Sequence, residues 1–305
     1  MIDFSKASYG CELELANVDT SITLPEGNTW CTKDGSICNS NGTANDPKHK
    51  LNRFGGEIQV RPASSPEELL STVEELYKLL NVNQDCFNFT TNLHVHIRIP
   101  GLSENLDFLK KTAIFTRKYD QQLFNMIEPI PKPNRKDYPS DEAYDGAHAR
   151  YKRRKRSHQY SVTEATYQKM LSAETPQQFW EAHAAKDKNG KPLWHLVVRA
   201  GVNLKQLWED SKTVEFRHFT MSPDLEKMYN AFCYPLIFFK CVVRDQDPTE
   251  FIKSMKFQQF YPYNYEMDKI FQMTNVYHNS RPIVEQNYKK LIEEGKLTKQ
   301  ELGLE

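Results

Sequence analysis

Glycine is scarce in this sequence. Only 12 of the 305 residues are Gly, which is about 4% where roughly 7% is usual. No two glycines are spaced G-x-G, and no pair five residues apart is followed by Lys and then Ser or Thr. The dinucleotide-binding fingerprint and the P-loop both need such glycines, because backbone N–H groups must come close to phosphate. These two glycine-rich nucleotide sites are therefore excluded.

Other familiar signals are missing as well. The chain has no run of 18 apolar residues, and no basic segment followed by an apolar stretch opens its N-terminus. We therefore expect neither a membrane span nor a signal peptide. None of the six cysteines forms a C-x-x-C pair, so we expect reduced, buried thiols in a cytoplasmic protein. The 40 basic and 40 acidic residues balance, which argues against a general nucleic-acid binder.

Hydrophobic periodicity predicts an α+β fold, since strands and helices alternate irregularly. Strands are expected at 9–16, 56–61, 92–99 and 212–219, helices at about 65–80, 103–127 and 224–243, and a strand or short helix at 193–199. Ser65 is the expected N-cap of the first helix, with Pro66 at its first position and Glu68 completing a capping box. We expect one domain over 1–305, in which 129–190 is a polar, basic elaboration and 224–305 is mainly helical.

The predicted strands share a feature, because each has one face made of ionisable or amide side chains. Residues two apart on a strand lie on the same face. The polar sets are Glu12 and Glu14; Glu57, Gln59 and Arg61; Asn92, His94, His96 and Arg98; and Glu215 and Arg217. Exposed sheet faces are often charged, so each set alone is ordinary. Carboxylates, imidazoles and guanidiniums together, however, are suited to binding Mg²⁺ or Mn²⁺ and phosphate. His218 falls on the opposite face from Glu215 and is expected in the core.

Four motifs in order give the sequence a family resemblance. They are Tyr9-Gly10-Cys11-Glu12-Leu13-Glu14; Trp30 with Asp34-Gly35-Ser36 and Gly56-Glu57-Ile58; Leu93-His94-Val95-His96; and Thr213-Val214-Glu215-Phe216-Arg217. Together they resemble the amidoligase branch of the glutamine synthetase-like carboxylate–amine ligases. Two departures are visible, since Asn92-Leu93 replaces a glycine before H-V-H and Arg61-Pro62 replaces S-P after the second Glu.

The resemblance implies a curved antiparallel sheet, flanked by helices, that holds divalent metal ions and ATP. It implies transfer of the γ-phosphate to a substrate carboxylate, followed by attack of an amine on the acyl phosphate. Five residues would bind metal: Glu12, Glu14, Glu57, His94 and Glu215. All of these except Glu14, together with Arg217, form the expected catalytic set. His96, Arg153, Arg154, Arg199 and Arg217 would contact ATP, and Trp30, Asp34 and Asn92 would line the substrate pocket.

The few glycines near these motifs have an expected role. Gly10 and the pair Gly55-Gly56 flank the acidic strand residues. A glycine within a strand often marks a close approach of a ligand or of another backbone. We therefore expect them to let phosphate or substrate come near the sheet.

A basic run stands apart from the strands. Residues Arg150–Arg156 carry six positive charges in seven positions. Three interpretations stay open: a solvated surface, a phosphate-binding segment that includes Arg153 and Arg154, and a local contact for nucleic acid or a modified nucleobase.

The sequence therefore favours an ATP- and Mg²⁺- or Mn²⁺-dependent ligase that forms an amide or isopeptide bond from small-molecule or peptide substrates. One alternative is a metal-dependent phosphoesterase or nuclease, because Glu/His sites also activate water. The other is a non-catalytic binding protein on a ligase-like fold, with the basic run as its contact surface.

Overall fold

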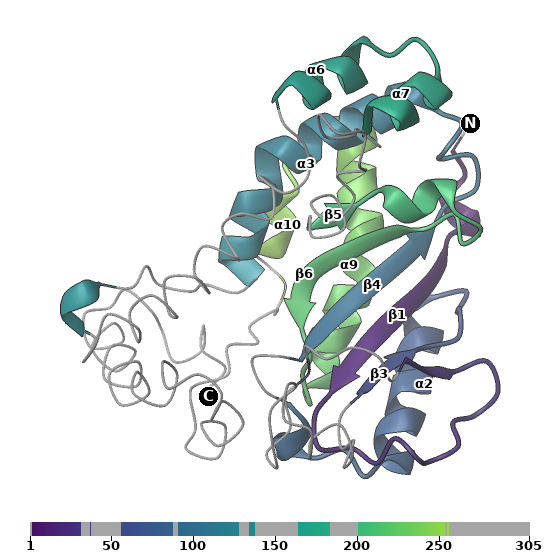
Figure 1. The fold of residues 1–305 in the computed structure, drawn as a ribbon, viewed down its shortest axis with the longest axis vertical. Helices are drawn as coiled ribbons and strands as arrows, with labels where there is room; N and C mark the ends of the chain where they lie inside the picture. The colour runs from purple at the N-terminus through teal and green to yellow at the C-terminus, as the bar shows by residue number, and fades with distance from the viewer. Residues whose placement is uncertain are drawn as a thin grey trace, which may run out of the picture.

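The structure, a computed structural model, describes residues 2–31, 37, 56–87, 91–127, 134–137, 164–183, 201–253 and 255. These residues form an open six-stranded antiparallel sheet with helices packed on it (Figure 1). The α+β prediction is thus confirmed. The elements in chain order are η1 (Phe4–Lys6), β1 (Ser8–Leu15), β2 (Thr29–Cys31), β3 (Gly56–Gln59), α2 (Pro66–Leu79), η2 (Gln84–Cys86), β4 (Asn92–Arg98), α3 (Leu106–Ile127), η3 (Arg135–Asp137), α6 (Glu164–Ser172), α7 (Pro176–His183), β5 (Val202–Asn203), η4 (Lys205–Trp208), β6 (Val214–Thr220), α9 (Leu225–Arg244) and α10 (Thr249–Ile252).

The strand order across the sheet is β2-β3-β1-β4-β6-β5, and every pair of neighbours is antiparallel. The four predicted strands all form, with slightly different ends. The second strand stops at Gln59, and the fourth begins at Val214 and ends at Thr220. Two short edge strands, β2 and β5, were not predicted, because three and two residues are too few to show a period.

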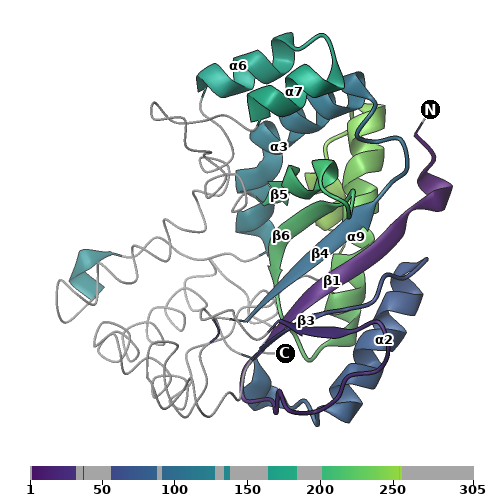
Figure 2. The ribbon, with the colours of Figure 1, turned by 45° about the vertical axis from the view of Figure 1, so that its right-hand side comes forward.

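Alternation along the strands divides the sheet into two faces. On β1, Cys11, Leu13 and Leu15 are buried on one face, while Gly10 and Glu12 on the other keep partial exposure. The apolar face is covered by helices: α2 and α9 lie behind the strands in Figures 1 and 2. Helix α3 packs against α9 and β6, and α6 and α7 pack on α3.

Helix α2 begins as the sequence predicts. The Ser65 hydroxyl accepts a hydrogen bond from the Glu68 N–H at 3.2 Å, and Pro66 occupies the first turn, where no N–H is needed. The capping box is modified, however, because the Glu68 carboxylate accepts from the N–H of Ser64 at 2.7 Å. The predicted apolar stripe is buried, and Leu69, Val73 and Leu76 have no exposed surface.

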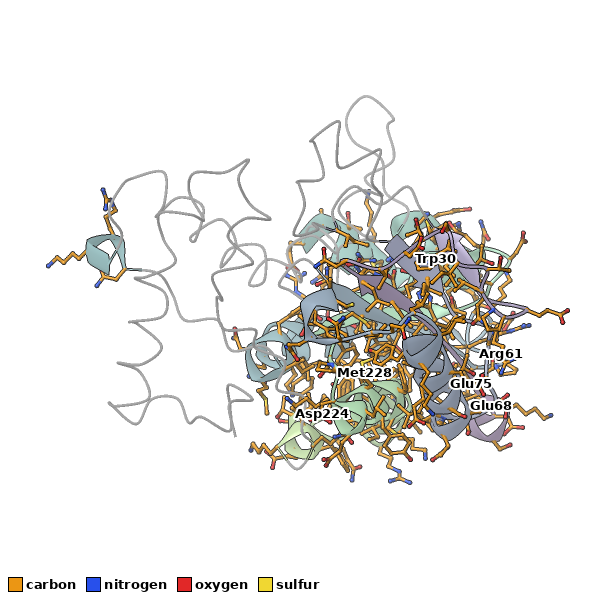
Figure 3. All side chains as sticks on the ribbon, turned by 90° about the horizontal axis from the view of Figure 1, so that it is seen from below. Trp30, Arg61, Glu68, Glu75, Asp224 and Met228 are labelled. Carbon is orange, nitrogen blue, oxygen red and sulfur yellow. The ribbon has the colours of Figure 1, made fainter. Side chains whose placement is uncertain are left out.

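Helix α9 is the central element of the helical layer. Asp224 caps it by accepting hydrogen bonds from the N–H groups of Glu226 and Lys227, at 3.0 and 3.4 Å. It ends one residue beyond the predicted Val243, and Asp245 follows in the left-handed region at φ 55°. Tyr229 ties the helix to α2, donating to Glu67 Oε1 at 2.5 Å. Figure 3 shows the start of α9 at Asp224 and Met228, and α2 at Glu68 and Glu75.

A polar pair interrupts the apolar layer. His218 projects from β6 to the helical side, as predicted, and its Nε2 lies 2.6 Å from Asp120 Oδ1 of α3. Both side chains have no exposed surface. The strand is irregular here, since the β4–β6 register shifts between Leu93 and Val95.

Some predictions meet the structure only in part. Helices α6 and α7 lie within 129–190, and α9 and α10 lie within 224–305. The single-domain prediction stays a prediction. All five described cysteines are free, but Cys31 and Cys233 are only partly buried. None of the helices described has the length and apolar character needed to cross a bilayer.

Candidate functional site

The polar face of the sheet gathers side chains from four strands that are far apart in the sequence. Pairing puts Glu12 beside His94, Gly10 beside His96, and His96 beside Glu215. Glu14 lies opposite Glu57 on the other side of β1. Because residues opposite one another on neighbouring strands are about 5 Å apart, these pairings create one continuous patch. We call Glu12, Glu14, His94, His96, Glu215 and Arg217 the acidic cluster.

His94 lies at the middle of the acidic cluster. Its Nδ1 is 2.7 Å from Glu12 Oε2 and 3.5 Å from Glu215 Oε1, and its Nε2 is 3.7 Å from Glu14 Oε1. The imidazole is almost fully buried, with 4% of its surface exposed. One imidazole therefore lies within 4 Å of three carboxylates from two other strands.

Two asparagines orient the carboxylates. Asn203 of β5 donates from Nδ2 to Glu215 Oε2 at 2.6 Å, and Glu215 Oε1 forms an ion pair with Arg217. Asn92 donates to Glu14 Oε2 twice, from its backbone N–H and its side-chain amide, each at 2.8 Å. Hydrogen bonds of this kind stabilise the ionised carboxylate. They also leave Glu14 Oε1 directed at His94.

The second histidine, His96, has a less complete set of partners. Its Nε2 lies 3.2 Å from Glu12 Oε1 as an ion-pair contact, and this buried atom makes no hydrogen bond. Its Nδ1 lies 3.4 Å from the Thr213 hydroxyl, which donates to Gln206. A buried ring nitrogen without a hydrogen bond is costly, unless it has a ligand such as a metal ion.

Three residues of the cluster meet the geometric condition for holding a metal ion. One ligand atom each from Glu12, His96 and Glu215 can be chosen so that all lie within 4.8 Å of one another. Two carboxylate oxygens and one imidazole nitrogen form a donor set that suits Mn²⁺, and Mg²⁺ when water completes the shell. The group that meets this condition thus includes His96, whereas the resemblance implied His94 as the nitrogen ligand, and that assignment stays a prediction.

The electrostatics of the cluster favour charged groups. Burial would raise the pKa of the Glu12 carboxyl, but contacts with His94 and His96 outweigh burial and hold that pKa well below its ordinary value. For His94, burial and the charge of Arg217 lower the pKa, while Glu12, Glu14 and Glu215 raise it, and the net direction is upward. Both shifts favour the charged forms, the Glu12 carboxylate and the His94 imidazolium, more than they are favoured in the free side chains.

The structure separates Trp30 from the cluster. Strand pairing puts Trp30 opposite Ile58, on the face away from Glu57, and its Nε1 donates to the Ile22 carbonyl at 2.9 Å. A Cβ at Gly56 would lie 3.2 Å from the Trp30 ring. Gly56 thus makes room for this tryptophan on the helical side. Figure 3 labels Trp30 near the strands.

Other predicted residues divide into two groups. Glu57 is buried on the polar face next to Glu14, and Gly10 borders His96 without close neighbours, since a Cβ there would meet no heavy atom nearer than 3.9 Å. Several candidates lie outside the described residues: Asp34, Gly55, Arg153, Arg154, Arg199 and the whole basic run Arg150–Arg156.

Asn203 was not among the predicted site residues. Strand β5 has only two residues, so no alternation could identify which face Asn203 occupies. The one available signal was its position shortly before the Glu215 strand.

No protein-family model, curated protein or solved structure matches this chain.

Proposed function

We propose that this protein is an ATP-dependent carboxylate–amine ligase that uses Mg²⁺ or Mn²⁺. The observation that supports it is the acidic cluster, in which ionisable side chains from β1, β4 and β6 meet on one sheet face. Glutamates and a histidine suited to a metal ion lie next to Arg217, whose guanidinium suits phosphate. Metal, phosphate and arginine together are the requirements of phosphoryl transfer without a P-loop.

The chemistry requires activation of a carboxylate, which is a poor electrophile. Its oxygen attacks the γ-phosphorus of ATP, and the bond from that phosphorus to the β–γ bridging oxygen breaks, which releases ADP. An amine then attacks the acyl carbon of the resulting acyl phosphate, and inorganic phosphate leaves as the amide forms. A divalent ion bound by Glu12, His96 and Glu215 would neutralise phosphate charge.

The chain's own residues would prepare this reaction. Asn203 and Arg217 hold Glu215 from two sides, so its carboxylate is fixed before any ligand arrives. Asn92 does the same for Glu14. Such preorganisation avoids the cost of rearranging charged groups during the reaction. Arg217 keeps partial exposure, with 29% of its side chain accessible, so its guanidinium can also reach a ligand.

The substrates can be left open in a first test. Purified protein is incubated with ATP, Mg²⁺, hydroxylamine and, one at a time, amino acids and other carboxylates. An acyl phosphate reacts with hydroxylamine to give a hydroxamate, which is detected by colour with iron(III), and ADP release is measured in parallel. We expect both products with at least one carboxylate.

Two site variants and one control complete the test. Glu12→Ala and Glu215→Ala should abolish ADP release, while Glu75→Ala, an exposed glutamate on α2 (Figure 3), should keep it. Equal turnover in the wild type and both site variants would refute the ligase. Hydrolysis of a phosphodiester without ATP would support the phosphoesterase instead.

A further inference from the structure

The irregularity in β6 lies directly beneath the acidic cluster. Val95 pairs with Phe216 and Leu93 with Phe219, so two residues of β6, Arg217 and His218, lie opposite the single residue His94. This is a β-bulge, a device that redirects side chains and often lies beside functional sites. Alternation from Glu215 already puts Arg217 on the polar face and His218 on the helical face, and the extra residue returns Phe219 to the helical side, where it is buried.

A buried pair holds the bulge from the helical side. His218 Nε2 lies 2.6 Å from Asp120 Oδ1, and the Phe124 ring packs 4.5 Å from the imidazole. Breaking such a pair is costly, but two apolar residues of similar volume often serve stability equally well. Packing alone therefore does not explain why β6 and α3 carry a histidine and an aspartate at 0% exposure.

Gly201 links the pair to Arg217. Its carbonyl accepts the Arg217 backbone N–H at 2.8 Å. A Cβ at this glycine would overlap Asp120 Oδ1, His218 Nε2 and Phe124 Cε2, all within 2.5 Å. One residue thus packs on the His218–Asp120 pair and also fixes the Arg217 backbone, two positions before strand residue Asn203, which holds Glu215.

We propose that the His218–Asp120 pair is a positioning device for Arg217. By fixing the bulge and the Gly201 carbonyl, it sets where the Arg217 guanidinium lies beside Glu215. The inference rests on the proposed function in one respect: there, Arg217 recognises the γ-phosphate of ATP. ATP has this phosphate and ADP does not, so the pair should control the preference for ATP over ADP.

The test replaces the pair without emptying the core. The double variant Asp120→Leu/His218→Phe fills the space with apolar groups, and a second variant, Asp120→Asn/His218→Gln, keeps two side chains able to hydrogen-bond each other. Dissociation constants for the β,γ-imido analogue of ATP and for ADP are measured with Mg²⁺ by calorimetry. Melting temperatures report stability.

We expect the apolar variant to bind the ATP analogue about tenfold more weakly while ADP changes less than twofold, a selective loss that general destabilisation would not cause. The amide variant should recover most of the preference. In an Arg217→Ala background the apolar replacement should add less than twofold. If the apolar variant keeps the wild-type preference for the ATP analogue over ADP, the inference is overturned.

A second measurement keeps the two proposals separate. If the wild type binds neither nucleotide, the proposed function is refuted, and the Arg217 Nε–H signal in ¹⁵N NMR spectra then decides the positioning role. We expect this signal to be shifted or broadened in the apolar variant and restored in the amide variant. An unchanged signal in the apolar variant would refute positioning whatever the function. If the apolar variant does not fold, Phe124→Leu, which trims the ring on His218, is measured in the same way.

Discussion

Two histidine–carboxylate pairs lie on opposite faces of one sheet. His94 and Glu12 are 2.7 Å apart on the polar face, and His218 and Asp120 are 2.6 Å apart on the helical face. The first pair has Glu14, Glu215 and Arg217 around it, whereas the second has aromatic rings and the backbone of Gly201. A histidine–carboxylate contact of the same kind thus lies among groups suited to binding ligands in the first pair and inside a packed core in the second. The surrounding residues therefore decide the role of each pair.

The largest expected difference between the two pairs is in catalysis. Matched amide substitutions, Glu12→Gln and Asp120→Asn, each remove a charge and keep an acceptor for the histidine. Glu12→Gln should lower the rate of ADP formation about 1,000-fold, or about 4 kcal/mol, because a proposed metal ligand is lost. Asp120→Asn should lower it less than tenfold. Steady-state kinetics measure both, with Glu75→Gln as the control, and similar losses in the two variants would contradict the distinction.

The sequence predicted features that depend on neighbouring residues better than features that depend on residues distant in the chain. Alternation placed Glu12, Glu14, His94 and Glu215 correctly and put His218 on the other face, because side-chain direction on a strand is local. It could not reveal that Glu12 pairs with His94, since strand order depends on contacts distant in the chain. It also gave no sign of the bulge.

Motif order was a weaker guide than strand register. Trp30 was assigned to the substrate pocket because it precedes Asp34 in the motif, yet pairing with Ile58 turns it to the helical side. Asn203, with its 2.6 Å hydrogen bond to Glu215, was missed because its strand is too short to show a period. The α2 helix was predictable in detail because caps and apolar stripes are encoded within a few residues.

A third buried histidine, His183, sharpens the comparison, because burial alone shifts its pKa and no carboxylate contributes. Burial lowers the pKa of His183 to about 4, and the ring stacks 5.8 Å from Trp180. The unfolded state, with an ordinary pKa of 6.5, therefore takes up the proton first as pH falls. The contribution of neutral His183 to the free energy of unfolding is therefore fully present above pH 6.5. As the pH falls from 6.5 to 4, the free energy of unfolding decreases by about 3 kcal/mol.

Denaturant unfolding at pH 7 and pH 4 measures this loss for wild type and His183→Phe. The aromatic replacement cannot be protonated, so its free energy of unfolding should fall less over this interval. Identical falls in both proteins would show that His183 keeps its ordinary pKa.

The two faces also differ in how they tolerate an added methyl group. Gly201→Ala would force a Cβ into the His218–Asp120 pair and should cost about 3 kcal/mol through overpacking and a strained buried pair. Gly10→Ala, on the polar face, meets no atom nearer than 3.9 Å and should change the unfolding free energy by less than about 1 kcal/mol. Urea unfolding of both variants gives the comparison, and equal costs would contradict the packing described for Gly201.

The smallest expected effect concerns metal binding to the folded state. A ligand that binds only the folded protein stabilises it by mass action, about 2.7 kcal/mol at 100 times its dissociation constant. Mg²⁺ or Mn²⁺ should therefore raise the melting temperature of the wild type and of the exposed control Glu75→Gln by similar amounts. The shift should disappear in Glu12→Gln, because among the described residues the group suited to a metal ion lies on the polar face and includes Glu12. A shift that survives in Glu12→Gln would locate the ion elsewhere, and no shift in the wild type at millimolar metal would remove the metal site from the comparison.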